Sequence, residues 1–202
     1  MTEKIYLYPI WVRLWHLLNA LLFIALIFTG LCLQYSSAEY TIIPFNYAIS
    51  IHNICGIILC ITYVFYLFAN LFTSNGNYYR FYLAGMLGRV LEQFKYYSYG
   101  IFTKKNAPFP ISINQKFNPL QKLSYVIIMY GIMPIIIITG ISLFFPDMLP
   151  NKIFGTSGIH TIDLLHIITG FILSIFMVVH IYFCTIGKTP MANFKSMING
   201  WH

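Results

Sequence analysis

The stretch IDLLHIITGFILSIFMVVHIYFCTI, residues 162–186, is a long apolar segment that carries two histidines. It is long and apolar enough to cross a membrane as one helix, which takes about 20 residues. Two histidines, His166 and His180, lie fourteen residues apart within it. Ionisable side chains at membrane depth are costly and usually functional, so this pair predicts a site inside the membrane.

Three further apolar segments of similar length precede this stretch. The four predicted spans are residues 14–34, 48–72, 121–145 and 162–186. The chain is 58% hydrophobic and only 8% charged, whereas soluble domains carry about 25% charged residues. Lipid must therefore be its main solvent. The predicted fold is an all-α membrane protein, a four-transmembrane-helix bundle, in which residues 1–202 form a single domain.

The basic residues predict the orientation of the bundle. The connection between spans one and two has no Lys or Arg, and the connection between spans three and four has only Lys152. The other eleven of the twelve basic residues lie on the opposite side of the predicted topology. Short loops rich in Lys and Arg stay in the cytoplasm, so both termini and the 73–120 loop are expected there. The net charge of +7 is thus a topology signal and does not indicate nucleic-acid binding.

The 73–120 loop is long for a connection within a bundle, which suggests structure of its own. Apolar residues recur at helical spacing from Tyr82 to Ile101, with Arg80, Arg89, Glu92 and Lys95 largely in the gaps. This pattern predicts an amphipathic helix that lies in the cytoplasmic interface between helices 2 and 3.

Four histidines are expected at two depths of this topology. His52 and His166 begin inward-running spans near the outer face, whereas His16 and His180 lie near the inner face. Fourteen helical residues rise about 21 Å and turn by a net of about 40°, so His166 and His180 share one face. Two bis-imidazole sites result, His52 with His166 and His16 with His180. Haem iron accepts axial histidines, whereas tetrahedral zinc needs three or four ligands at one level.

Several nearby residues keep alternative interpretations. Gly56 and Gly170, one turn from the outer histidines, can leave room for a porphyrin or for close helix packing. Thr29-Gly30 and Thr139-Gly140 end spans one and three, and with His52…Gly56 and His166…Gly170 they hint at two related helix hairpins. The cysteines are expected to be small core residues, with a Cys32–Cys55 disulfide as an alternative. His160 and His202 are expected on the surface.

The chain resembles the di-haem cytochrome b subunits of membrane-bound nickel–iron hydrogenases, respiratory formate dehydrogenases and thiosulfate or polysulfide reductases. The stretches that carry the resemblance are VRLWH (12–16), FTGLCL (28–33), IHNICG (51–56), KFNPLQK (116–122), ITGISLF (138–144), LHIITG (165–170), VVHIY (178–182) and GKTPMANFKSMINGW (187–201). The last of these is most similar to the thiosulfate-reductase type.

The resemblance implies two haems b held by these four histidines in the cytoplasmic membrane of a bacterium or archaeon. It also implies a site for menaquinone or another quinone by the inner haem, at Asn118 with Gln121 as a weaker candidate. Asn118 has an equally plausible role as a helix N-cap before Pro119, and one residue can serve both roles.

The predicted function is a membrane-anchoring di-haem b electron-transfer subunit of a quinone-linked oxidoreductase complex. It would connect the quinone pool, near the cytoplasmic face, to a periplasm-facing partner. Candidate partners are a molybdenum enzyme, a Ni–Fe hydrogenase, an iron–sulfur protein or a multihaem cytochrome c. One alternative is a stand-alone cytochrome b561-type oxidase of superoxide or another small donor, although the 73–120 segment argues against it. A second is a haem-free transporter with proton- or metal-carrying histidines.

Overall fold

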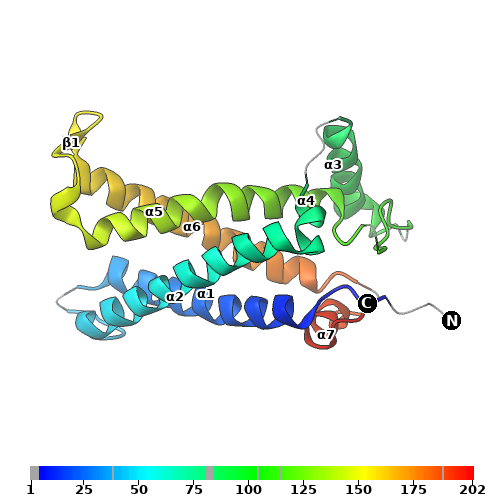
Figure 1. Cartoon of the computed structure of the whole chain (residues 1–202), viewed down its shortest axis with the longest axis horizontal. Helices are drawn as coiled ribbons and strands as arrows, with labels where there is room; N and C mark the ends of the chain where they lie inside the picture. Colours follow the sequence, from blue (N-terminus) through cyan, green and yellow to red (C-terminus); the bar gives the residue numbers. More distant parts are fainter. Residues whose placement is uncertain (1–4, 38, 81–83, 104, 114, 188) are drawn as a thin grey trace.

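Four long apolar helices form the body of the protein. The structure is a computed structural model that describes residues 5–37, 39–80, 84–103, 105–113, 115–187 and 189–202. The helices α1 (Ile10–Tyr35), α2 (Phe45–Phe72) and α6 (Gly158–Cys184), with a third span over Pro119–Phe144, are each long and apolar enough to cross a membrane. They run side by side along the long axis of the molecule (Figure 1). The predicted four-helix membrane bundle is confirmed.

All four spans begin earlier than predicted, the third by only two residues, at Pro119. α1 starts at Ile10 and α2 at Phe45, directly after Pro9 and Pro44, and α6 starts at Gly158. A proline fixes φ near the helical value and is favoured where a helix begins. Hydropathy alone missed these first turns because polar and aromatic residues such as Asn46 and His160 dilute the apolar signal there.

The third span is continuous but changes its winding. It consists of α4 (Pro119–Val126), a π-helical turn η3 (Ile127–Ile132) and α5 (Met133–Phe144). Pro134 lies at the start of α5 and has no backbone N–H to donate to the preceding turn. The wider π turn directly before it takes up this defect, so the helix crosses the bundle without a break.

The helices pack as two hairpins with a small shared core. α1 packs against α2, and α5 packs against α6, as the repeated TG and histidine motifs suggest. The core contains Leu22, Leu59, Tyr63, Ile128, Met133 and Leu173. Many other large apolar side chains, such as Phe68 and Phe171, are exposed on the outside of the bundle. A small core with many apolar side chains on the outside is expected of a chain whose solvent is lipid, because lipid tails are as apolar as a protein core.

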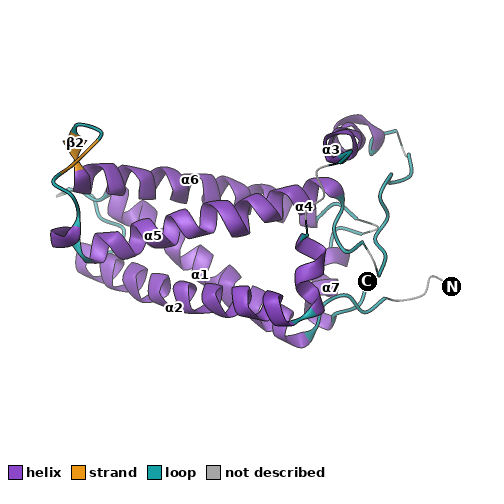
Figure 2. Cartoon of the chain, turned by 45° about the horizontal axis from the view of Figure 1, so that its top comes forward, coloured by secondary structure: helices purple, strands orange, loops and turns teal. Residues whose placement is uncertain are grey.

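The two ends of the bundle differ. We call one the hairpin end: it carries a short 3-10 turn η4 (Pro146–Met148) and the antiparallel strands β1 (Lys152–Ile153) and β2 (Thr156–Ser157). We call the other the terminal end, because the described ends of the chain, residues 5 and 202, lie there next to α7 (Ala192–Asn199), with α3 (Met86–Lys95) at the same end of the bundle (Figures 1 and 2). The strands and α7 were not predicted.

The predicted amphipathic helix is present at the terminal end, but it is shorter than expected. The connection begins with a 3-10 segment η1 (Ser74–Tyr79). The helix α3 starts at Met86, directly after Gly85, which is in a left-handed conformation with φ of 68°. It continues into a π-helical turn η2 (Tyr96–Gly100). The expected start at residues 82–83 lies outside the described residues. Met86 and Gln93 are buried, whereas Leu87, Leu91 and Phe94 are exposed, as an interfacial helix requires.

The chain termini pair with each other. Tyr6 forms a β-bridge with Trp201, and their rings lie 5.2 Å apart. The Leu7 N–H donates to the Gly200 carbonyl at 3.0 Å, and the Arg13 guanidinium donates to the Ile198 carbonyl. These contacts tie α7 to the entrance of α1.

Candidate functional site

One histidine pair lies toward the hairpin end of the bundle. His52 comes from α2, two turns after its start, and His166 comes from α6 at the matching level. Their ring centroids are 6.2 Å apart with 73° between the ring planes. The two hairpins of the fold therefore each contribute one imidazole to this level.

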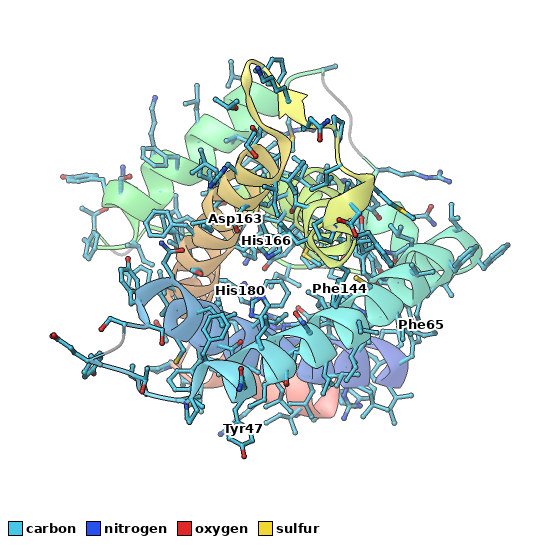
Figure 3. All side chains as sticks on the ribbon, turned by 90° about the vertical axis from the view of Figure 1, so that its left-hand side faces the viewer. Tyr47, Phe65, Phe144, Asp163, His166 and His180 are labelled. Atoms are coloured by element: carbon cyan, nitrogen blue, oxygen red, sulfur yellow. The ribbon has the colours of Figure 1, made fainter. Side chains whose placement is uncertain are left out.

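The second pair lies toward the terminal end. His16 of α1 and His180 of α6 have ring centroids 6.1 Å apart, with 56° between the planes. Figure 3, viewed from the hairpin end, shows His166 and His180 near the middle of the bundle, while Tyr47 and Phe65 lie toward its outside. The pairs that were predicted from depth alone are the pairs that the structure brings together.

The ring separations fit two imidazoles on one metal ion. An imidazole nitrogen binds a metal such as zinc at about 2 Å, and the ring centroid lies about 1 Å behind the nitrogen, so two axial rings place their centroids about 6 Å apart. Within the described ranges, no group of three or more His, Cys, Asp or Glu side chains gathers around a point. The donor set at each level is thus two imidazoles, which suits haem iron better than tetrahedral zinc.

A threonine contacts each histidine at the hairpin end. Thr29 Oγ1 lies 2.9 Å from His52 Nδ1, and Thr139 Oγ1 lies 3.0 Å from His166 Nδ1. Both threonines are 2% exposed. Each also reaches back along its own helix, Thr29 to the Ala25 carbonyl at 2.7 Å and Thr139 to the Ile135 carbonyl at 2.8 Å. The second hairpin thus repeats the threonine–histidine geometry of the first.

The glycines beside these threonines leave space for the imidazoles. A Cβ added at Gly140 would lie 3.2 Å from His166 Cε1, and one at Gly30 would lie 3.5 Å from His52 Cε1. The sequence repeat includes both Thr-Gly pairs, but the sequence does not predict their contact with histidine. Which histidine ring a Thr-Gly pair contacts depends on the rotation of its helix about the helix axis, and the sequence does not give this rotation.

The predicted glycines Gly56 and Gly170 have a different environment. A Cβ at Gly56 would meet nothing within 4 Å, and one at Gly170 would meet only Ile136 Cδ1, at 3.9 Å. Close helix packing therefore does not require glycine at either position. Open space one turn from His52 and His166 remains compatible with the predicted role in making room for a large planar group.

The terminal-end pair has aromatic surroundings instead of hydroxyls. The His180 ring stacks on Phe176, with centroids 5.8 Å apart and 19° between the planes, and it meets the edge of Tyr125 at 6.0 Å. Its Nε2 lies 3.8 Å from Cys184 Sγ, the length of a weak thiol contact. In the described part of the chain, no threonine or serine hydroxyl contacts His16 or His180.

Asn118 and Gln121 form a capping box at the start of the third span. Asn118 Oδ1 accepts from the Gln121 N–H at 2.9 Å, and Gln121 Oε1 accepts from the Asn118 N–H at 3.2 Å. This confirms the N-cap role. Asn118 Nδ2 donates to the Tyr97 hydroxyl at 2.8 Å. The Tyr97 ring lies 4.8 Å from that of Phe183, and burial raises the pKa of its hydroxyl. The Asn118–Tyr97 pair thus lies close to the helix turn that follows His180.

Lys116, two residues earlier, is buried in a cage that was not predicted. Its side chain is 2% exposed. Its Nζ donates to Asn75 Oδ1 at 3.2 Å and lies 4.5 Å from the centre of the Tyr8 ring. Burial lowers the pKa of Lys116 to about 8 and raises the pKa of Tyr8 to about 12. A lone lysine in a loop carries no sequence signal for burial, so only the fold reveals this cage.

The other candidate residues stay apart from the two histidine levels. His160 and His202 are exposed, and His160 lines a surface pocket at the hairpin end with Leu143, Ile159 and Asp163. All four cysteines are free thiols, including Cys32 and Cys55. Their alternative pairing as a disulfide is therefore not formed in the structure.

Four apolar helices with two histidine pairs at separate levels are the arrangement expected of a membrane-bound b-type cytochrome. A family model described as prokaryotic cytochrome b561 matches residues 7–200, and the chain belongs to this family. It is also 36% identical over 200 residues to the Escherichia coli (strain K12) protein named "Putative cytochrome YdhU", covering 99% of this chain and 75% of that protein. No solved structure matches it. Membership of the family makes the chain a multi-pass membrane protein of haem-b electron transport.

Proposed function

We propose that the chain is the membrane-anchoring di-haem b subunit that carries electrons between a periplasm-facing redox partner and the quinone pool. The observation that carries the proposal is the pair of ring separations, 6.2 Å at one level and 6.1 Å at the other. His52 and His166 would hold the haem at the hairpin end, and His16 and His180 the haem at the terminal end. Haem b, when bound, supplies reversible one-electron chemistry at each level.

The charges of the described residues support the orientation. At the hairpin end the described basic residue is Lys152, whereas Arg80, Arg89, Lys95 and Lys105 surround the terminal end. The positive-inside rule then places the terminal end in the cytoplasm and the hairpin end in the periplasm. On this orientation the partner meets the bundle at the hairpin end, where His160 is one exposed side chain available for contact.

The quinone site is proposed at the cytoplasmic end, around Asn118, Gln121 and Tyr97. The Asn118–Tyr97 pair supplies an amide and a hydroxyl, which can hydrogen-bond a quinone carbonyl, and Phe183 supplies an apolar wall next to them. Polar groups fixed among aromatic side chains are typical of a small-molecule site. Because Asn118 also caps the helix, its amide is held in place by the backbone rather than by the ligand.

The test is gentle solubilisation of the native membrane, followed by spectroscopy and identification of co-purifying proteins. We expect a b-type α-band in the reduced-minus-oxidised spectrum, two haems per chain, and a redox subunit bound to the complex. Quinol or quinone added to the complex should change the haem oxidation state. A lone subunit active with superoxide would support the stand-alone oxidase instead. The absence of any α-band would leave only a haem-free transporter.

A further inference from the structure

We infer that Thr29 and Thr139 are positioning residues that orient His52 and His166 for metal binding and lower the reduction potential of the hairpin-end haem. The inference rests on the proposed function, because it assigns a ligand role to these two histidines. It concerns two hydroxyl groups whose contacts with histidine the sequence alone does not predict. Four contacts of the described residues carry it, two from each helix hairpin.

The first step is the direction of each hydrogen bond. A threonine hydroxyl has one proton and two acceptor lone pairs. Thr29 Oγ1 lies 2.7 Å from the Ala25 carbonyl, and a carbonyl oxygen can only accept. The hydroxyl proton is therefore used toward Ala25, so the same oxygen must accept a proton from His52 Nδ1. The identical argument holds for Thr139, whose proton is directed to the Ile135 carbonyl at 2.8 Å.

The second step is the tautomer that follows. A neutral imidazole with its proton on Nδ1 has its lone pair on Nε2. Thr29 and Thr139, together with the Leu26 and Ile136 backbone groups that also hydrogen-bond these rings, thereby hold His52 and His166 in the form whose Nε2 can bind a metal. Gly30 and Gly140 allow each ring to lie against the helix that carries the threonine, since a Cβ there would approach Cε1 at 3.5 Å and 3.2 Å. Each Thr-Gly pair orients one imidazole by both hydrogen bonding and shape.

The third step concerns redox potential. A histidine that donates its second ring proton to an acceptor becomes a more basic ligand. A more basic axial ligand stabilises the ferric state over the ferrous state, which lowers the reduction potential. Thr29 and Thr139 act on both ligands of one level. Phe176, Tyr125 and the weak Cys184 contact surround His180 at the other level. The threonines therefore contribute a difference in potential between the two ends of the bundle.

The experiment compares Thr29→Val, Thr139→Val and the double variant with the unmodified protein. Valine keeps the shape of threonine but cannot accept a hydrogen bond. We expect the midpoint potential of the hairpin-end haem to rise in each single variant and to rise further in the double variant, with the terminal-end haem unchanged. Thr29→Ser and Thr139→Ser retain the hydroxyl and should restore the original potential.

Thr169 provides the matched control on α6. It is 3% exposed, and its hydroxyl donates to the Leu165 carbonyl at 2.6 Å without contacting a histidine. Thr169→Val should leave both potentials unchanged. The inference is overturned if the double valine variant binds both haems at unchanged potentials, or if both potentials shift equally. It is also overturned if serine and valine variants lose haem alike, because the loss then reflects packing.

Loss of haem in the valine variants with retention in the serine variants supports the positioning role. These results are distinguishable from failure of the proposed function. An unmodified protein without haem refutes the ligand assignment itself. An unmodified protein with two haems, together with unchanged potentials in the double valine variant, refutes only the role of the threonines.

Discussion

Asn118 donates a hydrogen bond of 2.8 Å from Nδ2 to the hydroxyl of Tyr97. This contact joins the π-helical turn after α3 to the first turn of the third span. The same asparagine caps that span through Oδ1. The two ends of one side-chain amide thus have separable contacts: Oδ1 caps the helix, and Nδ2 bonds Tyr97 at the proposed quinone site.

Substitution of Asn118 separates these contacts. Serine is about as good an N-cap as asparagine, so Asn118→Ser should change the free energy of unfolding by less than about 1 kcal/mol, whereas Asn118→Ala should cost about 0.5–2 kcal/mol. Both variants lose the donor to Tyr97 and should slow quinol-driven haem reduction. Stopped-flow reduction and chemical unfolding of the purified protein measure the two effects. Quinol kinetics of Asn118→Ser equal to the unmodified protein would mean that the amide is structural only.

Replacement of His180 tests whether the two histidine levels are independent. His180→Ala removes one imidazole from the terminal-end pair and leaves His52 and His166 in place. We expect haem content to fall from two to one per chain, with the hairpin-end haem retaining its spectrum and potential. His160→Ala is the control, since His160 is exposed, and it should keep both haems. Equal loss of both haems in His180→Ala would contradict two separate sites.

Lys116 makes stability depend on pH. Burial lowers its pKa from 10.5 to about 8, so between these values the unfolded chain binds more protons than the folded chain. Stability therefore rises with pH through this window, by up to roughly 3 kcal/mol at about 1.4 kcal/mol per unit. Lys116→Met should raise stability at pH 7 and flatten the rise between about pH 8 and 10.5. Unfolding in detergent at several pH values measures this.

The exposed Lys105 is the control for the Lys116 experiment. Lys105→Met should leave the pH dependence as it is in the unmodified protein. A Lys116→Met variant that is less stable at pH 7 would show that the contacts of the ammonium with Asn75 and Tyr8 outweigh the cost of its burial.

The two Thr-Gly pairs should differ in their tolerance of a methyl group. A Cβ at Gly140 would lie 3.2 Å from His166 Cε1, which is tighter than ordinary contact, whereas at Gly30 the distance to His52 is 3.5 Å. Gly140→Ala should therefore rotate its imidazole more than Gly30→Ala. The electron paramagnetic resonance spectrum of the oxidised protein reports the angle between axial rings and should shift more for Gly140→Ala.

Gly131→Ala serves as the control, because a Cβ there would meet nothing within 4 Å. It lies on the same span as Gly140 and should leave the spectrum unchanged. Equal shifts for Gly30→Ala and Gly140→Ala would indicate that the rings adjust freely at both positions.

The membrane spans and the depths of the histidines could be predicted from the sequence, because the lipid environment determines them. Apolar runs of about 20 residues or more are expected to be helices in a membrane, because a helix of that length spans the bilayer and satisfies its own backbone hydrogen bonds. The direction of each run then fixes the depth of its histidines, and so His52 was matched with His166 and His16 with His180. Pairing by depth needs no knowledge of helix rotation, which explains its success.

Features that depend on local geometry were not predictable in this way. The Thr29–His52 contact requires the rotation of α1 about its axis, and the burial of Lys116 requires the path of a loop. The strands at residues 152–157 are two residues each and have no periodic pattern. Pro134 predicts an irregularity in the third span. The sequence does not predict that the irregularity is a π turn directly before this proline.

α6 carries one imidazole of each level on a single helix that runs without interruption from Gly158 to Cys184. The third span, with its π turn, carries neither. Electron tunnelling slows exponentially with distance, so its rate is sensitive to changes of an ångström. Under the proposed function, the spacing of the two cofactors therefore follows from one uninterrupted helix and is independent of the altered winding of the third span.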